Sequence, residues 1–566
     1  MEDHIVFIFY IFTFLFSTIG YGFLFSKYIH KEFVELNLGY QGILGFFILS
    51  LISMITIFFF KHGYFHNIFI HSIGLILFLV NIFKDKKKKT ELRFIILLTL
   101  LLIIGTYVFK NHDDFPYYHL TYTLNLTNNS FIVGSGIFSH GFRTFSSLFY
   151  YHSLLFLPKI KFYLFHIGPF FILVFFNYVI LFNLREKIKE QKINFIYYFS
   201  LLSLIFINIV FYRLGEHGTD RSAQILLLLI FILFFEVFYF KKNNKNLSIL
   251  LSIMIVIIFL ASSMKAIYYL YLIIIPIVIY KSKVSSFLLN LKTIPLIIIL
   301  FLSLSINLTI NYFSTGCFLY PAEKTCLVKQ KWSIDSNEVK SMSTHYEWWS
   351  KAGGGPGYKS EVSREDYIKN FNWLNNWIDR HFFNKVLDTL VGILLISLIV
   401  FFYLYFNSKK KQSYKKKLNF SAYILPLLFL CEWFLNHPSM RYGGYVLFAI
   451  PLFMFASVIF DGYKMTRKKI LNFTIIFISI SFLVFIGRNI KRIDKEINFY
   501  KYDILNSPFF YVKKVNYYQI KKNKDLEIYS TKNNDMCWSS KTPCSYVKNL
   551  ALEKFLWMNM VFKNDK

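Results

Sequence analysis

Long apolar stretches alternate with short polar stretches along almost the whole of this 566-residue chain. A helix needs about 20 mainly apolar residues to cross the hydrocarbon core of a bilayer. Lipid cannot hydrogen-bond the backbone, and the stretches show no period-two alternation, so each is expected to be a helix and not a barrel strand. The pattern predicts about 14 spans. They are placed at residues 5–25, 41–60, 67–83, 93–110, 161–184, 193–212, 222–240, 247–263, 266–280, 291–313, 386–406, 419–436, 441–459 and 470–487.

The expected fold is an all-α integral membrane protein with a large outer loop and a small C-terminal outer module. Five regions follow from the positions of the spans. They are N-terminal transmembrane helices (1–92), a transmembrane core with an acidic outer loop at 111–160 (93–313), a large outer loop with an interfacial helix (314–385), C-terminal transmembrane helices (386–487) and an outer tail (488–566).

The orientation of the spans follows from the lysines and arginines. Cytoplasmic loops carry an excess of these residues. The basic clusters fall on every second loop, so the loops between them, and both termini, are expected outside the cytoplasmic membrane. The clusters lie at 84–93, 185–192, 241–245, 281–292, 409–417 and 464–469.

The net charge of +31 does not indicate nucleic-acid binding, because the lysines stand in short clusters between apolar runs and form no stripe with interleaved aromatics. The first residues, Met1 to His4, include two carboxylates where a secretory signal peptide would be basic. We therefore expect no cleaved signal and no nucleic-acid partner, and membrane lipids as the surroundings of the protein.

Four of the five cysteines fall in predicted outer segments, and they form two close pairs, Cys317 with Cys326 and Cys537 with Cys544. Outside the cytoplasm such cysteines form disulfides. Four cysteines allow three pairings, and proximity favours the two local ones. A zinc site is disfavoured because neither a C-x-x-C spacing nor a histidine pair accompanies the cysteines.

Ionisable residues gather on the predicted outer loops. Carboxylates and cations at a membrane boundary mark functional sites when they converge at one depth. The candidates are the carboxylates Asp113 and Asp114 as catalytic residues and, as substrate-binding residues, Glu216, His217, Asp220, Arg221, Lys265, Glu432, His437 and Arg441.

Each candidate has a plain structural alternative. The aspartate pair could end a helix in water, and the loop at 213–221 could be a polar hairpin with internal ion pairs. Lys265 stands alone between two apolar runs, where a lysine commonly extends its ammonium to water. Glu432 lies about one turn inside the predicted boundary, where an unpaired carboxylate is costly.

Two outer stretches are expected to lie along the membrane surface. Residues 141–157 are amphipathic and rich in aromatics. In the large loop, glycines at 353–357 predict a hinge, and Ser363 is a candidate N-cap for a helix reaching about His381. The tryptophans of that helix favour anchoring at the interface. A hinge followed by such a helix could act as a lid.

The chain resembles the C-type membrane glycosyltransferases, polytopic enzymes that take sugar from a polyprenyl-phosphate carrier. The resemblance rests on the many spans, the Asp113-Asp114 loop after a core helix, the amphipathic stretch behind it and a His-Pro-x-x-Arg-Tyr corner at His437–Tyr442. Here three spans precede the helix leading into the acidic loop, whereas that loop usually follows the first helix. Two short motifs, GCFLYPAEKTC and CWSSKTPCSY, are also similar to those of a bacterial multi-pass family close to these enzymes.

The resemblance implies transfer of a sugar from polyprenyl phosphate to a cell-envelope glycan or lipid on the outer face of the membrane. Asp113 or Asp114 would accept the proton of the acceptor hydroxyl. Arg441, with Arg221 or Lys265, would hold phosphate. Glu216, His217 and Asp220 could bind the acceptor or a divalent metal ion, the one cofactor considered.

Two other classes of protein remain open. A lipid-linked polysaccharide polymerase or ligase also has large outer loops, and would be favoured if outer arginines rather than carboxylates are essential. A polysaccharide flippase should carry charge at mid-membrane and show two similar halves. The sequence has no such repeat and almost no mid-span charge.

Overall fold

The computed structural model describes residues 2–107, 114–239, 244–282, 293–327, 329–353, 362–410, 421–500 and 503–564. Within them the chain is mostly helical, and ten helices are long and apolar enough to cross a membrane. Three shorter apolar helices accompany them, at Phe195–Val210, Ala266–Lys281 and Ser421–Asn436. The protein is therefore a multi-pass membrane protein, as expected, while the predicted total of about 14 spans stays a prediction.

The helices of the first half are as follows. They are α1 (Glu2–Tyr28), α2 (Leu38–Thr56), α3 (Tyr64–Ile82), α4 (Lys86–Leu102), α5 (Leu120–Asn128), α6 (Ser147–Ser153), α7 (Gly168–Lys189), α8 (Phe195–Val210), α9 (Leu214–Tyr239), α10 (Asn244–Met264), α11 (Ile274–Ser282) and α12 (Ile294–Thr315).

The second half adds seven helices and most of the strands. The helices are α13 (Ser336–Lys351), α14 (Arg364–Tyr367), α15 (Leu374–Trp377), α16 (Leu387–Asn407), α17 (Ser421–Asn436), α18 (Gly444–Asp461) and α19 (Arg467–Tyr500). The strands are β1 (Ile132–Val133), β2 (Lys409–Lys410), β3 (Tyr463–Lys464), β4 (Tyr517–Lys522), β5 (Glu527–Thr531), β6 (Leu550–Phe555) and β7 (Met558–Lys563).

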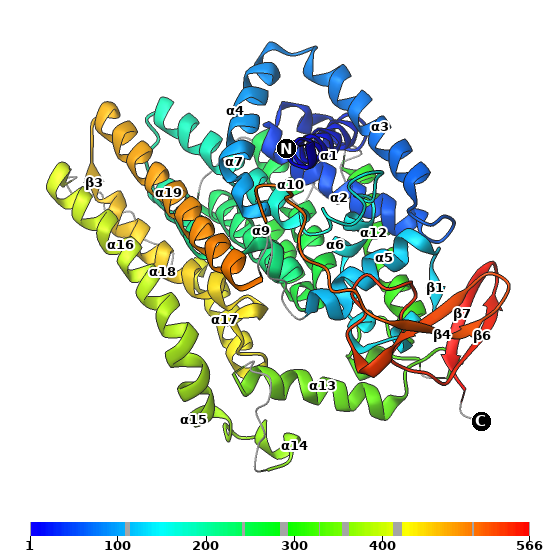
Figure 1. The fold of residues 1–566 in the computed structure, drawn as a ribbon. Coiled ribbons are helices and arrows are strands. Elements are labelled where there is room, and N and C mark those ends of the chain that lie inside the picture. The colour runs from blue at the N-terminus through cyan, green and yellow to red at the C-terminus, as the bar shows by residue number, and fades with distance from the viewer. Residues whose placement is uncertain are drawn as a thin grey trace.

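Burial separates central from peripheral helices. In α2 and in α9 from Gly218 onward, 89% of the apolar segment that could span a membrane is buried. The corresponding value is 22% in the helix Leu374–Asn407, which contains α16. Figure 1 accordingly shows α9 and α10 in the middle of the bundle, with α16 and α19 along one side. A helix that is apolar all round belongs inside the bundle, and the exposed apolar faces of peripheral helices are suited to lipid.

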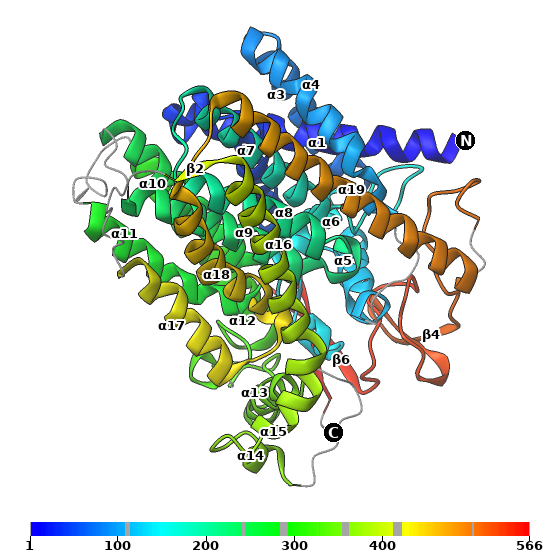
Figure 2. The same cartoon turned by 90° about the vertical axis from the view of Figure 1, so that its left-hand side faces the viewer.

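The two ends of the bundle carry different elements. At one end β2 pairs antiparallel with β3 and so brings Lys409 opposite Lys464. The opposite end carries α13, α14 and α15, at the bottom of both Figure 1 and Figure 2, and the C-terminal strands, in the lower right part of both views. We call these the lysine end and the site end. The orientation of the two ends in a membrane stays a prediction.

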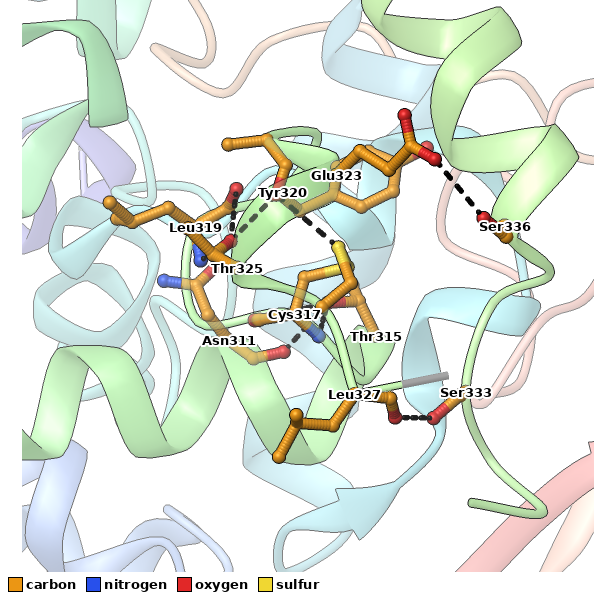
Figure 3. The surroundings of a disulfide bond; sticks show 12 residues. Asn311, Thr315, Cys317, Leu319, Tyr320, Glu323, Thr325, Leu327, Ser333 and Ser336 are labelled. Atoms are coloured by element: carbon orange, nitrogen blue, oxygen red, sulfur yellow. Dashed lines mark hydrogen bonds between the residues drawn. A yellow bond between two sulfur atoms is a disulfide. The ribbon is translucent and has the colours of Figure 1, made fainter. Parts of the chain in front are cut away.

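Both predicted disulfides are present. Cys317 is bonded to Cys326 and Cys537 to Cys544, and Cys431 is free within α17. Figure 3 shows the first disulfide in a compact turn, where the Cys317 amide donates to the Thr315 hydroxyl at 3.1 Å. The Ser336 hydroxyl at the start of α13 donates to Glu323 of the same turn. The disulfide turn thus supports the beginning of α13.

The tail is not a separate module. The helix α19 continues to Tyr500, well past the end predicted for the last span. Beyond it, β7 pairs antiparallel with β6 and parallel with β1, which lies between α5 and α6. The amide of Tyr546 also donates to the Phe138 carbonyl at 2.9 Å. The tail therefore packs on the segment at 114–143.

Two predicted interfacial stretches are wrong. Residues 141–157 do not lie on a surface, because the short helix α6 is buried against α2 and α5, with Tyr150 and Tyr151 fully covered. In the large loop, Ser363 does cap a helix, accepting from the Asp366 amide at 3.1 Å, but that helix ends at Tyr367. Trp373 and Trp377 are buried and do not anchor an interfacial helix.

Candidate functional site

Four ionisable side chains from distant parts of the chain meet at the site end. Asp114 immediately precedes a π-helical turn (Phe115–His119). Asp220 lies in the first turns of α9, and Lys265 follows the last residue of α10. Arg441 lies in a 3-10 turn between α17 and α18. Each lies at or near the end of a helix, where the apolar sequence gives way to charged residues. This explains why all four lie at the same end of the bundle.

The four side chains are joined by ion pairs. The Arg441 guanidinium donates from Nε to Asp220 Oδ2 at 2.6 Å and from Nη2 to Asp114 Oδ2 at 2.8 Å. The second oxygen of Asp220 accepts from the Lys265 ammonium. We call Asp114, Asp220, Lys265 and Arg441 the charged cluster. The charges of its two carboxylates and two cations sum to zero. Charged side chains that are shielded from water need such partners.

Burial within the charged cluster is uneven. The Asp220 side chain is only 3% exposed, whereas those of Asp114 and Arg441 are 26% and 30% exposed. Burial disfavours the charged guanidinium, but Asp220 and Asp114 outweigh it and hold the pKa of Arg441 well above its ordinary value. Burial lowers the pKa of Lys265 despite Asp220. Asp220 is thus the buried carboxylate of the cluster, and Asp114 is the more accessible one.

Aromatic rings line the charged cluster. The Lys265 ammonium lies 4.5 Å from the centre of the Tyr442 ring, and Arg441 Cζ lies 5.7 Å from the Trp349 ring. Such contacts stabilise a cation while leaving its hydrogen-bond donors for carboxylates or phosphate. Burial raises the pKa of Tyr442 to about 12, so its hydroxyl is a neutral donor at physiological pH.

The helix α13 covers this region. It contributes Trp349 and also Tyr346, whose hydroxyl lies 2.8 Å from Nε2 of His140. Burial, with the charge of Arg143 nearby, lowers the pKa of His140 to about 4, so the ring is neutral at physiological pH. The sequence reading missed α13, because its apolar residues are few and it stands in a polar loop. Its local signals were the N-cap Asp335, which accepts from the Asn337 amide, and a short apolar stripe at Val339, Met342, Tyr346 and Trp349.

Indole and amide donors fix the corner that carries Arg441. Trp377 donates to the Pro438 carbonyl at 2.7 Å, and Trp433 donates to the Ser439 carbonyl at 2.9 Å. The Gln224 amide, one turn along α9 from Asp220, donates to the carbonyl of Arg441 at 3.3 Å. Gly443, with φ of 107°, closes the corner in a conformation that favours glycine. These contacts fix the backbone that carries the Arg441 guanidinium before any ligand binds.

Not every predicted residue joins the charged cluster. Glu432 instead accepts from Asn436 one turn along α17. The Arg221 guanidinium lies between the rings of Phe211 and Tyr445, at 4.5 and 4.4 Å. His437 lies beside the cluster, its ring 5.9 Å from that of Tyr442.

Burial lowers the pKa of His437, so its imidazole is neutral at physiological pH. Asp113 and the side chains of Glu216 and His217 lie outside the described part of the chain. Among the side chains that the structure describes, no group of three or more His, Cys, Asp or Glu could hold a metal ion.

A second ionic contact lies nearby and was also missed. Glu338 of α13 accepts from Arg143 at 2.7 Å and from Lys563 of β7 at 3.0 Å. It thereby joins three segments that the sequence separates by about 200 residues each. No local pattern could have revealed this contact, because it depends on how the tail packs.

Fold and site together define a multi-pass membrane protein with a charge-balanced cluster at one end of its helical bundle. The family described as a domain of unknown function (DUF8201) matches residues 5–448, and the chain belongs to this family. The match covers all four members of the charged cluster and stops before the tail. Neither a curated protein nor a solved structure matches the chain.

Proposed function

We propose that the charged cluster is the catalytic centre of a membrane glycosyltransferase. The donor would be a sugar on polyprenyl phosphate, and the acceptor a hydroxyl of a cell-envelope glycan or lipid on the outer face of the cytoplasmic membrane. The observation that carries the proposal is the direct contact between Asp114, a partly exposed carboxylate, and Arg441, a guanidinium held in place by Asp220. A general base and a phosphate-binding cation are the two groups that this reaction needs side by side.

The reaction balances with these residues. The acceptor oxygen bonds to the anomeric carbon, whose bond to the phosphate oxygen breaks. The hydroxyl proton passes to the Asp114 carboxylate, and polyprenyl phosphate leaves as an anion. Arg441 and Lys265 would offset the charge that develops on the leaving phosphate.

Binding of the donor would exchange partners within the charged cluster. A phosphate oxygen can replace Asp114 at Nη2 of Arg441, because Asp114 is the more exposed of the two carboxylates. Asp220 keeps its contact with Nε and with Lys265, so the cations stay oriented. Asp114 is then released beside the bound donor, where a base is required. Trp349 and Tyr442 would offer ring faces to the sugar.

The test compares Asp114→Asn with Asp388→Asn in a strain that lacks the chromosomal gene. Asp388 is an exposed carboxylate in the first turn of α16 and serves as the matched control. Mass spectrometry of lipid extracts should show an accumulated polyprenyl-phosphate sugar in the deletion strain. Wild type and Asp388→Asn should clear it. Asp114→Asn should turn it over about 10²–10⁴-fold more slowly, the usual cost of losing a general base.

Equal expression and melting temperature of the variants are required for this reading. Wild-type turnover by Asp114→Asn at normal expression would end the proposal that this residue is the base. If Arg441 is essential while Asp114 is not, that result would favour a lipid-linked polysaccharide polymerase or ligase.

A further inference from the structure

A polar cavity lies at the site end, away from the charged cluster. Its volume is about 670 Å³, and it lies between the end of α8 and the last turns of α19. Five of its lining residues are cationic and one is a carboxylate. We call it the cationic pocket, and its lining residues are Tyr212, Arg213, Arg488, Lys491, Arg492, Lys495, Glu496 and Phe499.

The spacing of its residues explains the pocket. Positions 488, 491, 492, 495 and 499 recur at intervals of three and four, so they share one face of a helix. That face exists because α19 continues to Tyr500 as one helix. The sequence reading ended the last span at residue 487 and treated these lysines and arginines as part of a polar tail, so it did not detect the stripe.

Several of the cations are held in place by the protein. Arg488 donates from Nη1 to the carbonyl of Ile209 at 2.7 Å, and its Cζ lies 4.0 Å from the centre of the Tyr212 ring. Arg492 is only 8% exposed and donates to the carbonyl of Tyr107. By contrast, Lys491 and Lys495 are exposed and form the rim of the pocket. Guanidinium groups oriented beneath a lysine rim are suited to a phosphate, which accepts several charge-assisted hydrogen bonds.

The level of the pocket indicates where such a phosphate would come from. Within α19, the apolar side chains of Ile476, Ile480 and Leu483 are 42–67% exposed and are suited to the bilayer core. The first charged residue after them is Arg488, little more than one turn beyond Leu483. The pocket therefore lies where the hydrocarbon of the membrane gives way to lipid headgroups.

We propose that the cationic pocket binds the phosphate headgroup of an anionic phospholipid such as phosphatidylglycerol. The bound lipid would join the ends of α8 and α19, which the pocket already brings together through Arg488 and Ile209. None of its lining residues belongs to the charged cluster, and the stacked pair of Arg221 and Phe211 occupies the connection from α8 to α9. The proposal does not depend on the glycosyltransferase reaction.

The test measures lipid affinity of the full-length protein in a neutral detergent by native mass spectrometry. The variant Lys491→Gln/Lys495→Gln removes two rim charges without touching the anchored arginines. Lys468→Gln/Lys469→Gln is the matched control, since it removes two exposed lysines at the other end of the same helix. A basic side chain near an anionic membrane raises affinity about fivefold, so two should account for about 30-fold.

Titrations with phosphatidylglycerol, phosphatidylcholine, polyprenyl phosphate and inorganic phosphate identify the ligand. We expect tight binding of phosphatidylglycerol over phosphatidylcholine, a loss of about 30-fold in the rim variant, little change in the control, and recovery in Lys491→Arg/Lys495→Arg. Unchanged affinity in the rim variant, or an equal loss in the control, would overturn the site. Displacement of the lipid by millimolar inorganic phosphate, or a strong preference for polyprenyl phosphate, would overturn the assignment to a phospholipid.

Discussion

Asp220 is the structural support of the charged cluster, and its removal should cost more stability than that of any other member. Asp220→Asn keeps the volume of the side chain but removes the carboxylate that Arg441 and Lys265 share. Arg441 keeps Asp114, whereas Lys265 loses its carboxylate partner. Removing one partner of a buried ion pair typically costs about 3–5 kcal/mol. The Lys265 side chain is 22% exposed, so we place the cost near the lower limit, at about 3 kcal/mol.

Because Asp220 and Lys265 form an ion pair, the effects of replacing them on the free energy of unfolding should not add. Packing alone does not predict this. Lys265→Met leaves Asp220 paired with Arg441 and should cost about 1 kcal/mol. In the double variant Asp220→Asn/Lys265→Met, the remaining pair of Asp114 and Arg441 still balances. The double variant should therefore be more stable than the sum of the single effects by about 1–3 kcal/mol.

Tryptophan fluorescence during denaturant unfolding in detergent micelles would measure these free energies. The structure offers Trp349, Trp377 and Trp433 close to the cluster as reporters. Effects of the two substitutions that add to within about 0.5 kcal/mol would show that the pair carries no coupling energy and would refute this reasoning.

Three further predictions concern the surroundings of the site. Arg441→Lys keeps the charge but removes the planar guanidinium that contacts two carboxylates. Clearance of the lipid-linked sugar should therefore slow by at least about tenfold at unchanged expression. Normal clearance would argue against phosphate binding by Arg441. Burial opposes ionisation of Glu338, yet Lys563 and Arg143 hold its pKa below the usual value. Its stabilising contribution is therefore present above about pH 4.3 and lost as the pH falls further. The protection of β7 amides against hydrogen exchange, relative to the unfolded chain, should fall there, and Glu338→Gln should show the lower protection already at about pH 7. Cys537→Ser should cost about 2 kcal/mol and release the tail to proteolysis, and equal protease resistance of variant and wild type would contradict this.

Much of the candidate site could be predicted because a charged side chain is unfavourable in the hydrocarbon of a membrane. A charge beside an apolar span is rare enough that each one is noticeable. Asp114, Asp220, Lys265 and Arg441 were all found on that ground alone, and the structure joins them directly. The same criterion selected Glu432 and Arg221, which instead contact Asn436 and aromatic rings. The sequence locates charges along the chain but does not show their partners.

The polar segments at the site end were harder to predict, because their structure depends on contacts with distant residues. The helix α13 has only a short apolar stripe inside a polar loop, and Glu338, Tyr346 and Trp349 place it against other segments. Residues 141–157 have the composition of a surface helix, yet α2 and α5 cover the helix α6 that they form. Amphipathic segments are ambiguous in this way, because an apolar face is buried equally well by lipid or by protein.

The two aspartates of the charged cluster show how the surroundings separate groups of the same chemistry. Both contact the same guanidinium, so charge pairing alone assigns them the same role. Asp220 is buried and shared between two cations, and protonating it would leave both of them without their common carboxylate. Asp114 contacts Arg441 from a partly exposed position, so it can release that cation and accept a proton at lower cost. In the proposed reaction, the difference in exposure therefore favours Asp220 as the buried counter-ion and Asp114 as the accessible base.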